Sequence, residues 1–429
     1  MEATVAAIEP GRLAGTAAVP PSKSAAHRAV VCAALAAGTS HIGNVEFSQD
    51  ILATLGAAQQ LGAKVERGEH ELTITGRGNA DGFATITRPV FCNESGSTLR
   101  FILPLFSLTA QKVRFTGAGR LMQRPQEIYA QLFERQGLRF EQNEQGITIF
   151  GRLCPGTFTL PGNVSSQFIS GLLFALPLLA GDSTLHLIPP VESRSYIEMT
   201  RAAQAAFGVT SHWLDDTTLC IPGGQQYHPR DYIVEGDYSQ AAFLAVLGAV
   251  KGGITLTGLA AETLQGDAAI LDILRRCGAK FTRTEAGLVF EQAPLHGVDI
   301  DLADCPDLGP VLMVLGLLCE GTTVIRNAER LRIKESDRIA AMEAELRACG
   351  GVLSSEGGTI TVQGCKPQLH APEAPLSGHN DHRVVMSLTV LALAADIPLA
   401  INEAEAVQKS WPHFFDALKP LGVEVHYAG

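Results

Sequence analysis

Long apolar runs recur along the sequence, and each run opens at a short polar segment. Their length and their Ala- and Leu-rich composition predict buried helices. The predicted starts lie about 70 residues apart, near Ser22, Ser95, Ser165, Tyr238, Asp307 and Asp381. A second helix is predicted after each of them, near Ser48, Pro125, Ser195, Gly266, Glu335 and Trp411. Each helix of this second series ends at a glycine, the residue that most often follows a helix, and a β-rich stretch comes next.

This spacing predicts six copies of one α/β unit that contains two helices and several short strands. The period exceeds the usual repeat lengths of solenoids, so we expect two domains of three units each rather than a rod. The midpoint falls at residues 234–237, where Gly236 is a candidate hinge. If equivalent helices share an orientation, their polar starts converge on one place, most simply a cleft between the two halves.

Composition excludes several classes of protein. The chain has 429 residues, of which 46% are apolar and 18% charged, and its formal net charge is −11. These values are typical of a globular protein with large cores, and they argue against nucleic acid or a membrane surface as the main partner. No apolar stretch reaches the roughly 20 residues of a membrane span, and no basic segment suggests a signal peptide. Nine scattered cysteines, without CxxC or metal-ligand spacing, favour reduced thiols in the cytoplasm and no metal site.

Cations are nevertheless concentrated at the predicted helix starts. The set comprises Lys23, Arg28, Arg124, Lys334, Arg338, Arg383 and Lys409. In an acidic protein this concentration suggests one or two small, highly anionic substrates. The alternative is that these cations are solvated or structural. For Lys23 and Arg28 we weigh the two interpretations equally, and for Arg100 we favour the structural role. Residues 332–338 hold five charged side chains in seven positions, a density that favours a ligand-binding site over a solvated surface.

The polar helix starts also carry neutral and acidic groups. Residues 163–167 place four polar side chains on the edge of a very apolar helix, and residues 379–383 are polar throughout, which exceeds what capping requires. Asp307 opens an apolar helix either as a cap or as a general base for a substrate hydroxyl. The helix start at Gly236–Gln240 is best explained as an ordinary helix cap beside a hinge. We find no P-loop, no GxGxxG dinucleotide fingerprint and no GxSxG elbow.

Together these residues make the chain resemble the enolpyruvyl transferase family, most closely its branch that uses shikimate 3-phosphate. The resemblance spans nearly the whole chain. It rests on segments 22–28, 96–100, 123–125, 164–167, 193–197, 334–338 (Lys-Glu-Ser-Asp-Arg) and 380–383 (Asn-Asp-His-Arg), and on Lys409. It implies an α/β fold of two domains, each made of three βαβαββ units around buried parallel helices. One domain would comprise residues 1–20 and 236–429, the other the inserted residues 21–235, with the active site in the interdomain cleft.

The resemblance also implies a reaction between shikimate 3-phosphate and phosphoenolpyruvate that releases phosphate. It assigns the shikimate phosphate to Lys23, Ser24, Arg28, Ser165, Ser166, Gln167, Ser193, Asp307 and Lys334. It assigns phosphoenolpyruvate to Lys23, Gly96, Arg124, Gln167, Arg338, Arg383 and Lys409. We expect Asp307 to act as the base for the hydroxyl, Glu335 as the acid for C3, Lys23 to join them in catalysis, and His382 to support the site. The reaction needs no metal or organic cofactor, and we expect a cytoplasmic monomer.

Two features depart from the family pattern. Phe101 replaces the usual proline, and segment 193–196 reads Ser-Arg-Ser-Tyr instead of the commoner Ser-Lys-Pro-Tyr. The nearest alternative is the sister branch that uses UDP-N-acetylglucosamine, but residues 116–125 lack its cysteine and Lys23 is followed by Ser24 rather than Asn. A non-enzymatic protein that binds a phosphorylated metabolite is the alternative from another class. The retained pair Asp307 and Glu335 argues against it, and a purely structural repeat would not need so many cations at helix starts.

Overall fold

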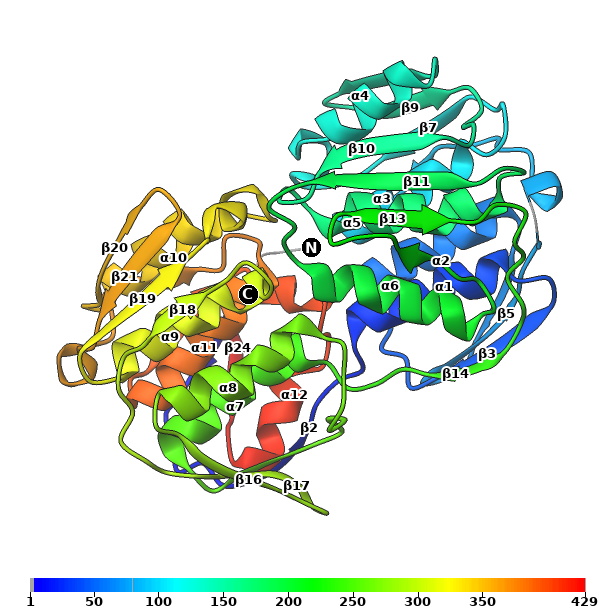
Figure 1. Ribbon diagram of the computed structural model, residues 1–429. Coiled ribbons are helices and arrows are strands. Elements are labelled where there is room, and N and C mark those ends of the chain that lie inside the picture. Colours follow the sequence, from blue (N-terminus) through cyan, green and yellow to red (C-terminus); the bar gives the residue numbers. More distant parts are fainter. Residues whose placement is uncertain (1–3, 79, 429) are drawn as a thin grey trace. The chain divides into compact units, whose positions relative to one another are not determined.

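The structure is a computed structural model that describes residues 4–78 and 80–428. Its residues group into two compact units. The first, here called the terminal unit, takes the chain up to Ser22 and from Gly236 onward. The second, here called the inserted unit, is the continuous segment Lys23–Glu235. Figure 1 labels the elements of both units.

Each unit contains three sheets of four strands, and all six sheets share one topology. In every sheet one edge strand runs parallel to its neighbour, and the remaining neighbours pair antiparallel. The orders in the terminal unit are β22-β23-β1-β24, β16-β17-β15-β2 and β18-β19-β21-β20; those in the inserted unit are β14-β3-β5-β4, β6-β7-β9-β8 and β10-β11-β13-β12. The predicted six copies of an α/β unit are therefore confirmed.

The strands are short. Those of the terminal unit are β1 (Val5–Ile8), β2 (Gly15–Ala18), β15 (Ile254–Thr257), β16 (Lys280–Thr284), β17 (Gly287–Glu291), β18 (Asp299–Asp301), β19 (Thr322–Arg326), β20 (Val352–Glu356), β21 (Thr359–Gln363), β22 (Leu376–Ser377), β23 (Leu399–Asn402) and β24 (Val425–Ala428). Those of the inserted unit are β3 (Thr39–Gly43), β4 (Lys64–Arg67), β5 (Glu71–Thr75), β6 (Val90–Phe91), β7 (Val113–Thr116), β8 (Arg139–Asn143), β9 (Gly146–Phe150), β10 (Thr157–Pro161), β11 (Ser183–Ile188), β12 (His212–Trp213), β13 (Thr218–Ile221) and β14 (Asp231–Ile233).

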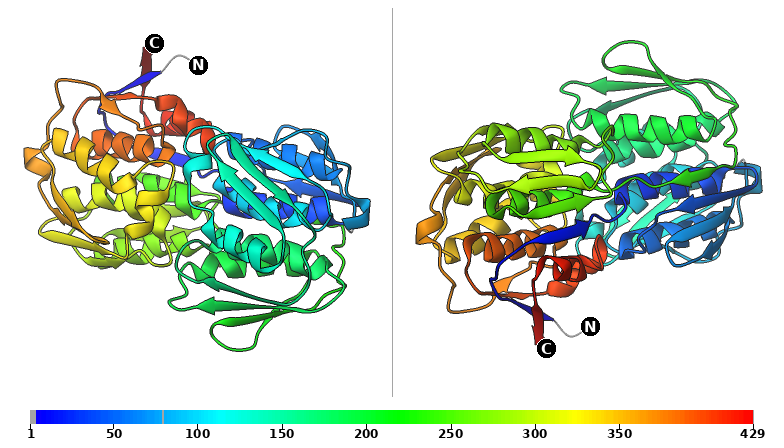
Figure 2. Two further views of the ribbon diagram at one scale, coloured as in Figure 1. Left: turned by 90° about the horizontal axis from the view of Figure 1, so that it is seen from above. Right: turned by 90° about the horizontal axis from the view of Figure 1, so that it is seen from below.

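Two strands are exchanged between copies of the repeat. β2 precedes α1 in the chain but pairs with β15 of the terminal unit, whereas β14 precedes α7 but pairs with β3 of the inserted unit. The segments that follow these strands lie side by side, since the Asp237 N–H donates to the Pro20 carbonyl at 2.8 Å. β1 completes the last sheet between β23 and β24, so the two ends of the chain share one sheet (Figure 2).

The helices form two series, as predicted. The first helix of each copy is buried: α1 (Lys23–Leu35), α3 (Gly96–Phe106), α5 (Ser166–Ala175), α7 (Tyr238–Lys251), α9 (Gly309–Leu318) and α11 (His382–Ala395). The second helix packs with one face inward: α2 (Gln49–Leu61), α4 (Glu127–Arg135), α6 (Arg194–Ala206), α8 (Ala269–Arg276), α10 (Arg338–Ala348) and α12 (Phe414–Leu418). A helix that is apolar on all sides, such as α9, is stable only when surrounded by protein.

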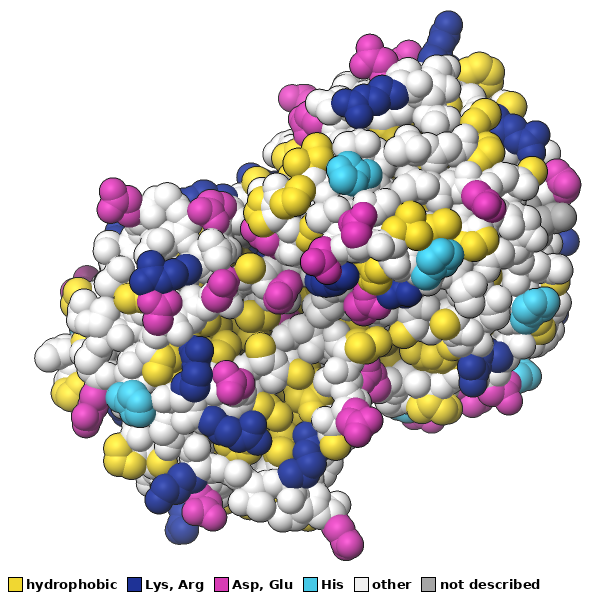
Figure 3. Space-filling model, in the orientation of Figure 1, with side chains coloured by type: hydrophobic (Ala, Val, Ile, Leu, Met, Phe, Trp, Pro, Cys, Tyr) yellow, Lys and Arg dark blue, Asp and Glu magenta, His cyan; other side chains and the backbone are white. Residues whose placement is uncertain are grey.

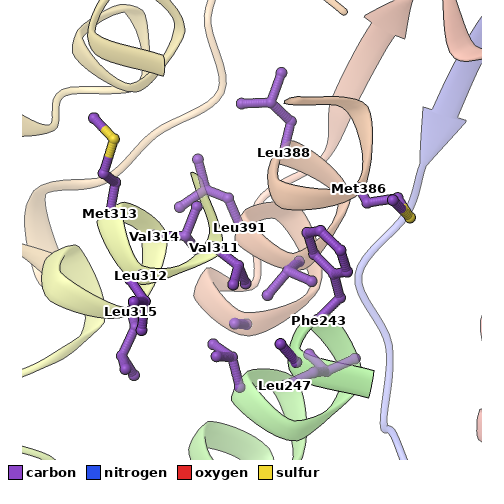
Figure 4. Close-up of a cluster of buried hydrophobic side chains, with 14 of the residues drawn as sticks. Phe243, Leu247, Val311, Leu312, Met313, Val314, Leu315, Met386, Leu388 and Leu391 are labelled. Carbon is purple, nitrogen blue, oxygen red and sulfur yellow. The ribbon is translucent and has the colours of Figure 1, made fainter. Parts of the chain in front are cut away.

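In the terminal unit the three buried helices run in the same direction. α7, α9 and α11 pack around a core in which Phe243, Met313 and Leu391 are fully buried (Figure 4). Their starts lie together, because Arg383 of α11 bonds to Ser239 of α7 and to Asp307, two residues before α9. Their last residues line one pocket at the opposite end of the unit. This arrangement brings the three polar helix starts to one place.

The structure corrects three local expectations. Asp307 is not a helix cap: it lies in a 3-10 turn (Pro306–Leu308), and α9 begins at Gly309 with Leu308 at the cap position. The two helices predicted to begin near Pro125 and Trp411 begin two and three residues later, α4 at Glu127 and α12 at Phe414. Among the described residues, none of the helices has the length and apolar character needed to cross a membrane.

Candidate active site

A cluster of charged side chains lies at the helix starts of the terminal unit, with Asp307 among three cations. Lys334 Nζ and Arg338 Nη1 lie 3.2 and 3.0 Å from Asp307 Oδ1. Arg383 Nη2 lies 3.4 Å from Asp307 Oδ2, and Arg383 Nη1 donates to the Asp307 carbonyl at 3.0 Å. The carboxylate is therefore engaged by cations rather than by backbone N–H groups at a helix start, which favours a chemical role over capping.

These cations control the ionisation of Asp307. Burial by itself favours the neutral acid, but Arg383, Lys334 and Arg338 outweigh burial and hold the pKa of Asp307 well below its usual range. Burial lowers the pKa of the Lys334 ammonium, an effect that Asp307 opposes. Asp307 is thus a carboxylate at neutral pH, and its basicity depends on how many of its cations are occupied elsewhere.

Arg338 joins this aspartate to two further carboxylates. The side chain is 1% exposed, and its Nε lies 2.8 Å from Asp381 Oδ2 while its Nη2 lies 2.6 Å from Glu335 Oε2. Burial opposes its charge, but the three carboxylates raise the pKa of Arg338 above its ordinary value. Burial likewise opposes ionisation of Asp381, whose pKa is nevertheless lowered by Arg338. The Ser336 hydroxyl donates to the same Asp381 oxygen at 3.0 Å.

Lys334 and Arg338 do not lie on one helix, because the helix predicted to begin near Glu335 begins three residues later. Lys334 ends a 3-10 segment (Glu329–Ile333), and α10 begins only at Arg338. The Lys-Glu-Ser-Asp-Arg segment is therefore a bend, and its two cations meet at Asp307 instead of along a helix face.

The start of α11 completes the cluster. Asp381 caps the helix by accepting from the Arg383 N–H at 2.9 Å, and Arg383 Nη2 donates to the Ser239 hydroxyl at 2.7 Å. The Lys409 ammonium donates to the Asn380 carbonyl and is buried, so it is not the solvated lysine considered above. His382 is buried, with its Nδ1 lying 3.9 Å from Asp381 Oδ1.

A second cluster lies at the helix starts of the inserted unit. Lys23, the first residue of α1, forms an ion pair of 2.7 Å with Asp50 in the first turn of α2. Asp50 in turn contacts the start of α3, because its carbonyl accepts from the Thr98 hydroxyl at 3.3 Å. The sequence reasoning missed Asp50. The available signal was its position two residues after Ser48, the cap of a helix in the second series.

Arg28 is built into the core of the inserted unit. It is buried and donates to the Thr200 hydroxyl (2.8 Å) and to the carbonyls of Ser24 (2.7 Å) and Tyr196 (2.9 Å). Its guanidinium also lies 5.1 Å from the centre of the Phe101 ring. Burial lowers the pKa of Arg28 to about 10, so it remains charged at neutral pH. These contacts orient the guanidinium through α1 and α6.

Gln167 connects α5 to the start of α3. Its amide oxygen accepts from Arg100 Nη1 at 2.8 Å, and its amide nitrogen donates to the Ser97 hydroxyl at 2.9 Å. Arg100 is buried and lies over the Phe168 ring, which agrees with the structural role favoured from the sequence. Gln167 is thereby held in one orientation at the cluster.

Gly96 and Arg124 are in direct contact. A Cβ atom added to Gly96 would lie 2.9 Å from Arg124 Nη1 and 3.1 Å from its Cζ. Arg124 is buried, and it follows the short 3-10 segment Leu121–Gln123. Only glycine therefore allows the guanidinium to lie against the first turn of α3.

The remaining predicted hydroxyl groups also lie at helix starts. Ser165 caps α5 by accepting from the Gln167 N–H at 3.3 Å, and Ser166 is the first residue of that helix. Ser24 lies in the first turn of α1. Ser193 is buried before α6 in the left-handed region (φ 54°), which is unfavourable for serine and frequent at functional sites.

The two clusters account for the concentration of cations predicted from the sequence. On the face shown in Figure 3, Lys and Arg side chains are scattered among Asp and Glu side chains. Within residues 4–78 and 80–428, no group of three or more His, Cys, Asp or Glu side chains is arranged to hold a metal ion. Each cluster instead presents buried or half-buried cations beside helix N-termini, an arrangement suited to anionic ligands.

Known proteins share this sequence and fold. A family model described as EPSP synthase (3-phosphoshikimate 1-carboxyvinyltransferase) matches residues 8–418. The 3-phosphoshikimate 1-carboxyvinyltransferases of Clostridium kluyveri and Clostridium beijerinckii are each 40% identical to the chain, over 97% of both sequences. An EPSP synthase structure from Acinetobacter baumannii matches with a TM-score of 0.81 and 25% identity, covering 99% of this chain and 100% of that one. The enolpyruvyl transferase NikO from Streptomyces tendae shares the fold (TM-score 0.78, 19% identity, 99% of both chains). The chain therefore belongs to the EPSP synthase family.

Proposed function

We propose that the two clusters of charged side chains carry out the reaction of this family. As a family member, the protein is a transferase of aromatic amino-acid biosynthesis in the shikimate pathway. It transfers the enolpyruvyl group of phosphoenolpyruvate to the 5-hydroxyl of shikimate 3-phosphate and releases phosphate. The observation that carries the assignment of residues is Asp307, a carboxylate surrounded by three cations beside Glu335.

Both substrates are anions, and we assign cations to each. For shikimate 3-phosphate the inserted unit offers Lys23, Ser24, Arg28, Ser165, Ser166, Gln167 and Ser193, and the terminal unit offers Asp307 and Lys334. For phosphoenolpyruvate the inserted unit offers Lys23, Gly96, Arg124 and Gln167, and the terminal unit offers Arg338, Arg383 and Lys409. The hydrogen bonds and ion pairs described above fix these side chains at the helix starts. This supports the assignment, because preorganised donors bind an anion with little loss of entropy.

Asp307 is the proposed base for the 5-hydroxyl. In the protein alone its low pKa makes it a weak base, since three cations stabilise the carboxylate. Anionic substrates that bind Lys334, Arg338 and Arg383 neutralise those cations and raise the basicity of Asp307. The base is thereby strengthened only when substrates are bound, when it can take the hydroxyl proton as the oxygen attacks C2 of phosphoenolpyruvate.

Glu335 is the proposed acid for C3. The carbon must gain a proton as C2 is attacked, and the resulting tetrahedral adduct then expels phosphate, which the cations stabilise as it leaves. Arg338 fixes the Glu335 carboxylate at 2.6 Å. The negative charge of phosphoenolpyruvate beside it favours the protonated form of Glu335.

The Glu335→Gln variant tests this role. We expect kcat to fall about 10²- to 10³-fold because proton transfer contributes roughly this factor, while the KM values change little. In D2O the wild-type enzyme should incorporate deuterium at C3 of phosphoenolpyruvate by reversing the addition, and the variant should lose this exchange. Exchange at the wild-type rate would assign the acid to another group.

The Gly96→Ala variant tests the phosphoenolpyruvate assignment. A methyl group would displace the Arg124 guanidinium, which it meets at 2.9 Å. We expect KM for phosphoenolpyruvate to rise about tenfold, equivalent to about 1.4 kcal/mol, with KM for shikimate 3-phosphate unchanged. Steady-state kinetics with each substrate varied in turn measure both values. An equal rise in both would mean that Arg124 does not act on phosphoenolpyruvate specifically.

Phosphate release by the purified protein tests the function as a whole. One reaction contains phosphoenolpyruvate and shikimate 3-phosphate, and the other contains phosphoenolpyruvate and UDP-N-acetylglucosamine, with EDTA in both. We expect release in the first only. Release in the second only would assign the protein to the sister reaction, and no release from folded protein in either would favour a binding protein.

We also propose that the protein works as a monomer in the cytoplasm and uses no cofactor. The nine cysteines are all free, which suits a reducing compartment. Light scattering coupled to size-exclusion chromatography tests the oligomeric state, because a single species near 45.5 kDa is expected.

A further inference from the structure

The turn before α11 contains a histidine that the proposed mechanism does not use. His379 and Asn380 both lie in the left-handed region of the backbone (φ 51° and 48°). Positive φ costs energy for residues other than glycine, less for Asn and His than for most, and two such residues in succession persist only where the surroundings fix them. Asn380 presents its carbonyl to Lys409, and the next residue, Asp381, holds Arg338. The conformation of this turn therefore sets the positions of two cations assigned to phosphoenolpyruvate.

Glu345 fixes this turn from α10. One carboxylate oxygen, Oε1, lies 2.7 Å from His379 Nε2, and the other, Oε2, accepts from the Ser377 N–H at 3.1 Å. The Ser377 hydroxyl accepts from the His379 N–H at 3.0 Å and donates to Glu403 at 2.9 Å. The same helix begins with Arg338, so α10 contacts both ends of the segment from Ser377 to Asp381.

We propose that His379 is a positioning residue for phosphoenolpyruvate, because its contact with Glu345 holds the turn that orients Lys409 and Arg338. The inference rests on the proposed function, in which those two cations bind phosphoenolpyruvate. Nothing in it requires His379 to touch the substrate.

The contact makes this positioning dependent on pH. Three acidic groups act on His379: Glu345 on α10, Glu403 after β23, and Asp381 at the start of α11. The hydrogen bond that His379 donates to Glu345 outweighs partial burial and raises the pKa of His379 above its ordinary value. The charged pair is thus fully formed at acidic pH and is lost as pH rises through the pKa of the folded protein. His379 Nε2 still donates to the Glu345 carboxylate when the imidazole is neutral, but the attraction between two opposite charges is lost.

The His379→Asn variant tests the proposal. Asparagine tolerates the left-handed conformation but is too short to reproduce the contact, so the backbone preference is kept and the ion pair removed. We expect KM for phosphoenolpyruvate at pH 6 to rise about fivefold, the scale of one lost charge-assisted bond. The values of kcat and of KM for shikimate 3-phosphate should stay within twofold of wild type.

The pH profile separates positioning from a general loss of structure. In the wild type we expect KM for phosphoenolpyruvate to rise between pH 6 and 9 as the pair loses its charge. His379→Asn and Glu345→Gln should both remove this rise of KM with pH. In His379→Lys the side chain stays charged throughout, so KM for phosphoenolpyruvate should be low at every pH in the range. His413→Asn is the matched control, because His413 pairs with Asp416 at an exposed site (3.3 Å) and should leave the profile unchanged.

The outcomes distinguish a failure of the positioning role of His379 from a failure of the proposed function. A wild-type KM and an unchanged pH profile in both His379→Asn and Glu345→Gln would overturn the positioning role while leaving the proposed function intact. A wild-type protein that releases no phosphate from the two substrates would instead refute the proposed function. If His379→Asn does not fold, Glu345→Gln and His379→Lys still decide the question.

Discussion

Replacing Asp307 by alanine is expected to lower kcat about 10⁴-fold, which corresponds to about 5.5 kcal/mol of transition-state stabilisation. This value lies at the upper end of the range for a general base because, in the proposed mechanism, the aspartate accepts the proton and also holds three cations at one point. The KM for phosphoenolpyruvate should stay constant or fall, since Arg338 and Arg383, the cations assigned to it, lose a competing carboxylate. Steady-state kinetics separate the two effects.

The Asp307→Asn variant distinguishes proton transfer from positioning. The amide keeps the shape of the side chain and an oxygen that accepts from Arg338, but it is not a base. We therefore expect its kcat to be almost as low as that of the alanine variant. A kcat within tenfold of wild type would show that Asp307 arranges the cations and that another group takes the proton.

Replacing Arg338 by methionine is expected to cost about 5 kcal/mol of the free energy of unfolding. Removing one partner of a buried ion pair typically costs 3–5 kcal/mol because the other charge stays buried without compensation, and Arg338 neutralises both Asp381, which is fully buried, and Glu335. Urea unfolding measures the loss. The Arg338→Met, Asp381→Asn double variant should recover most of it, because it removes the stranded charge as well.

Two controls make this result specific. Arg332 in the same segment is partly exposed and lies 3.3 Å from Asp337, so Arg332→Met should cost less than about 1 kcal/mol. Arg338 lowers the pKa of Asp381, so its stabilising effect is present above the pKa of an unfolded aspartate, about 3.9, and is lost on acidification. The deficit of Arg338→Met should therefore shrink as pH falls below about 4. A constant deficit across this range would point to lost packing rather than to stranded charge.

The repeat and the helix starts could be predicted from the sequence because they depend on local patterns. The starts of the buried helices were placed within two residues, and the six glycines after the second series all adopt positive φ, as expected past a helix end. Both signals come from apolar periodicity and from the φ angle that glycine alone adopts easily. Gly62, for example, ends α2 with φ 105°.

Partners within the clusters could not be predicted, because they depend on packing between distant segments. Lys23 pairs with Asp50 and Lys334 with Asp307, in each case across 27 residues and from different elements. The chain also bends between Lys334 and the start of α10 at Arg338, which local patterns did not show. The exchange of β2 and β14 was equally invisible to local patterns, because a strand as short as Asp231–Ile233 fits many sheets.

The strand exchange has a consequence for synthesis on the ribosome. Every strand of the inserted unit has left the ribosome once β14 is made, whereas β2 must wait for β15 and β1 must wait for β23 and β24. At typical elongation rates this delay lasts on the order of tens of seconds. Throughout it, β1 and β2 are unpaired edges exposed to other nascent chains. Each strand is only four residues long, shorter than the roughly six or seven residues typical of aggregating segments, so the segments that wait longest are poor nuclei for aggregation.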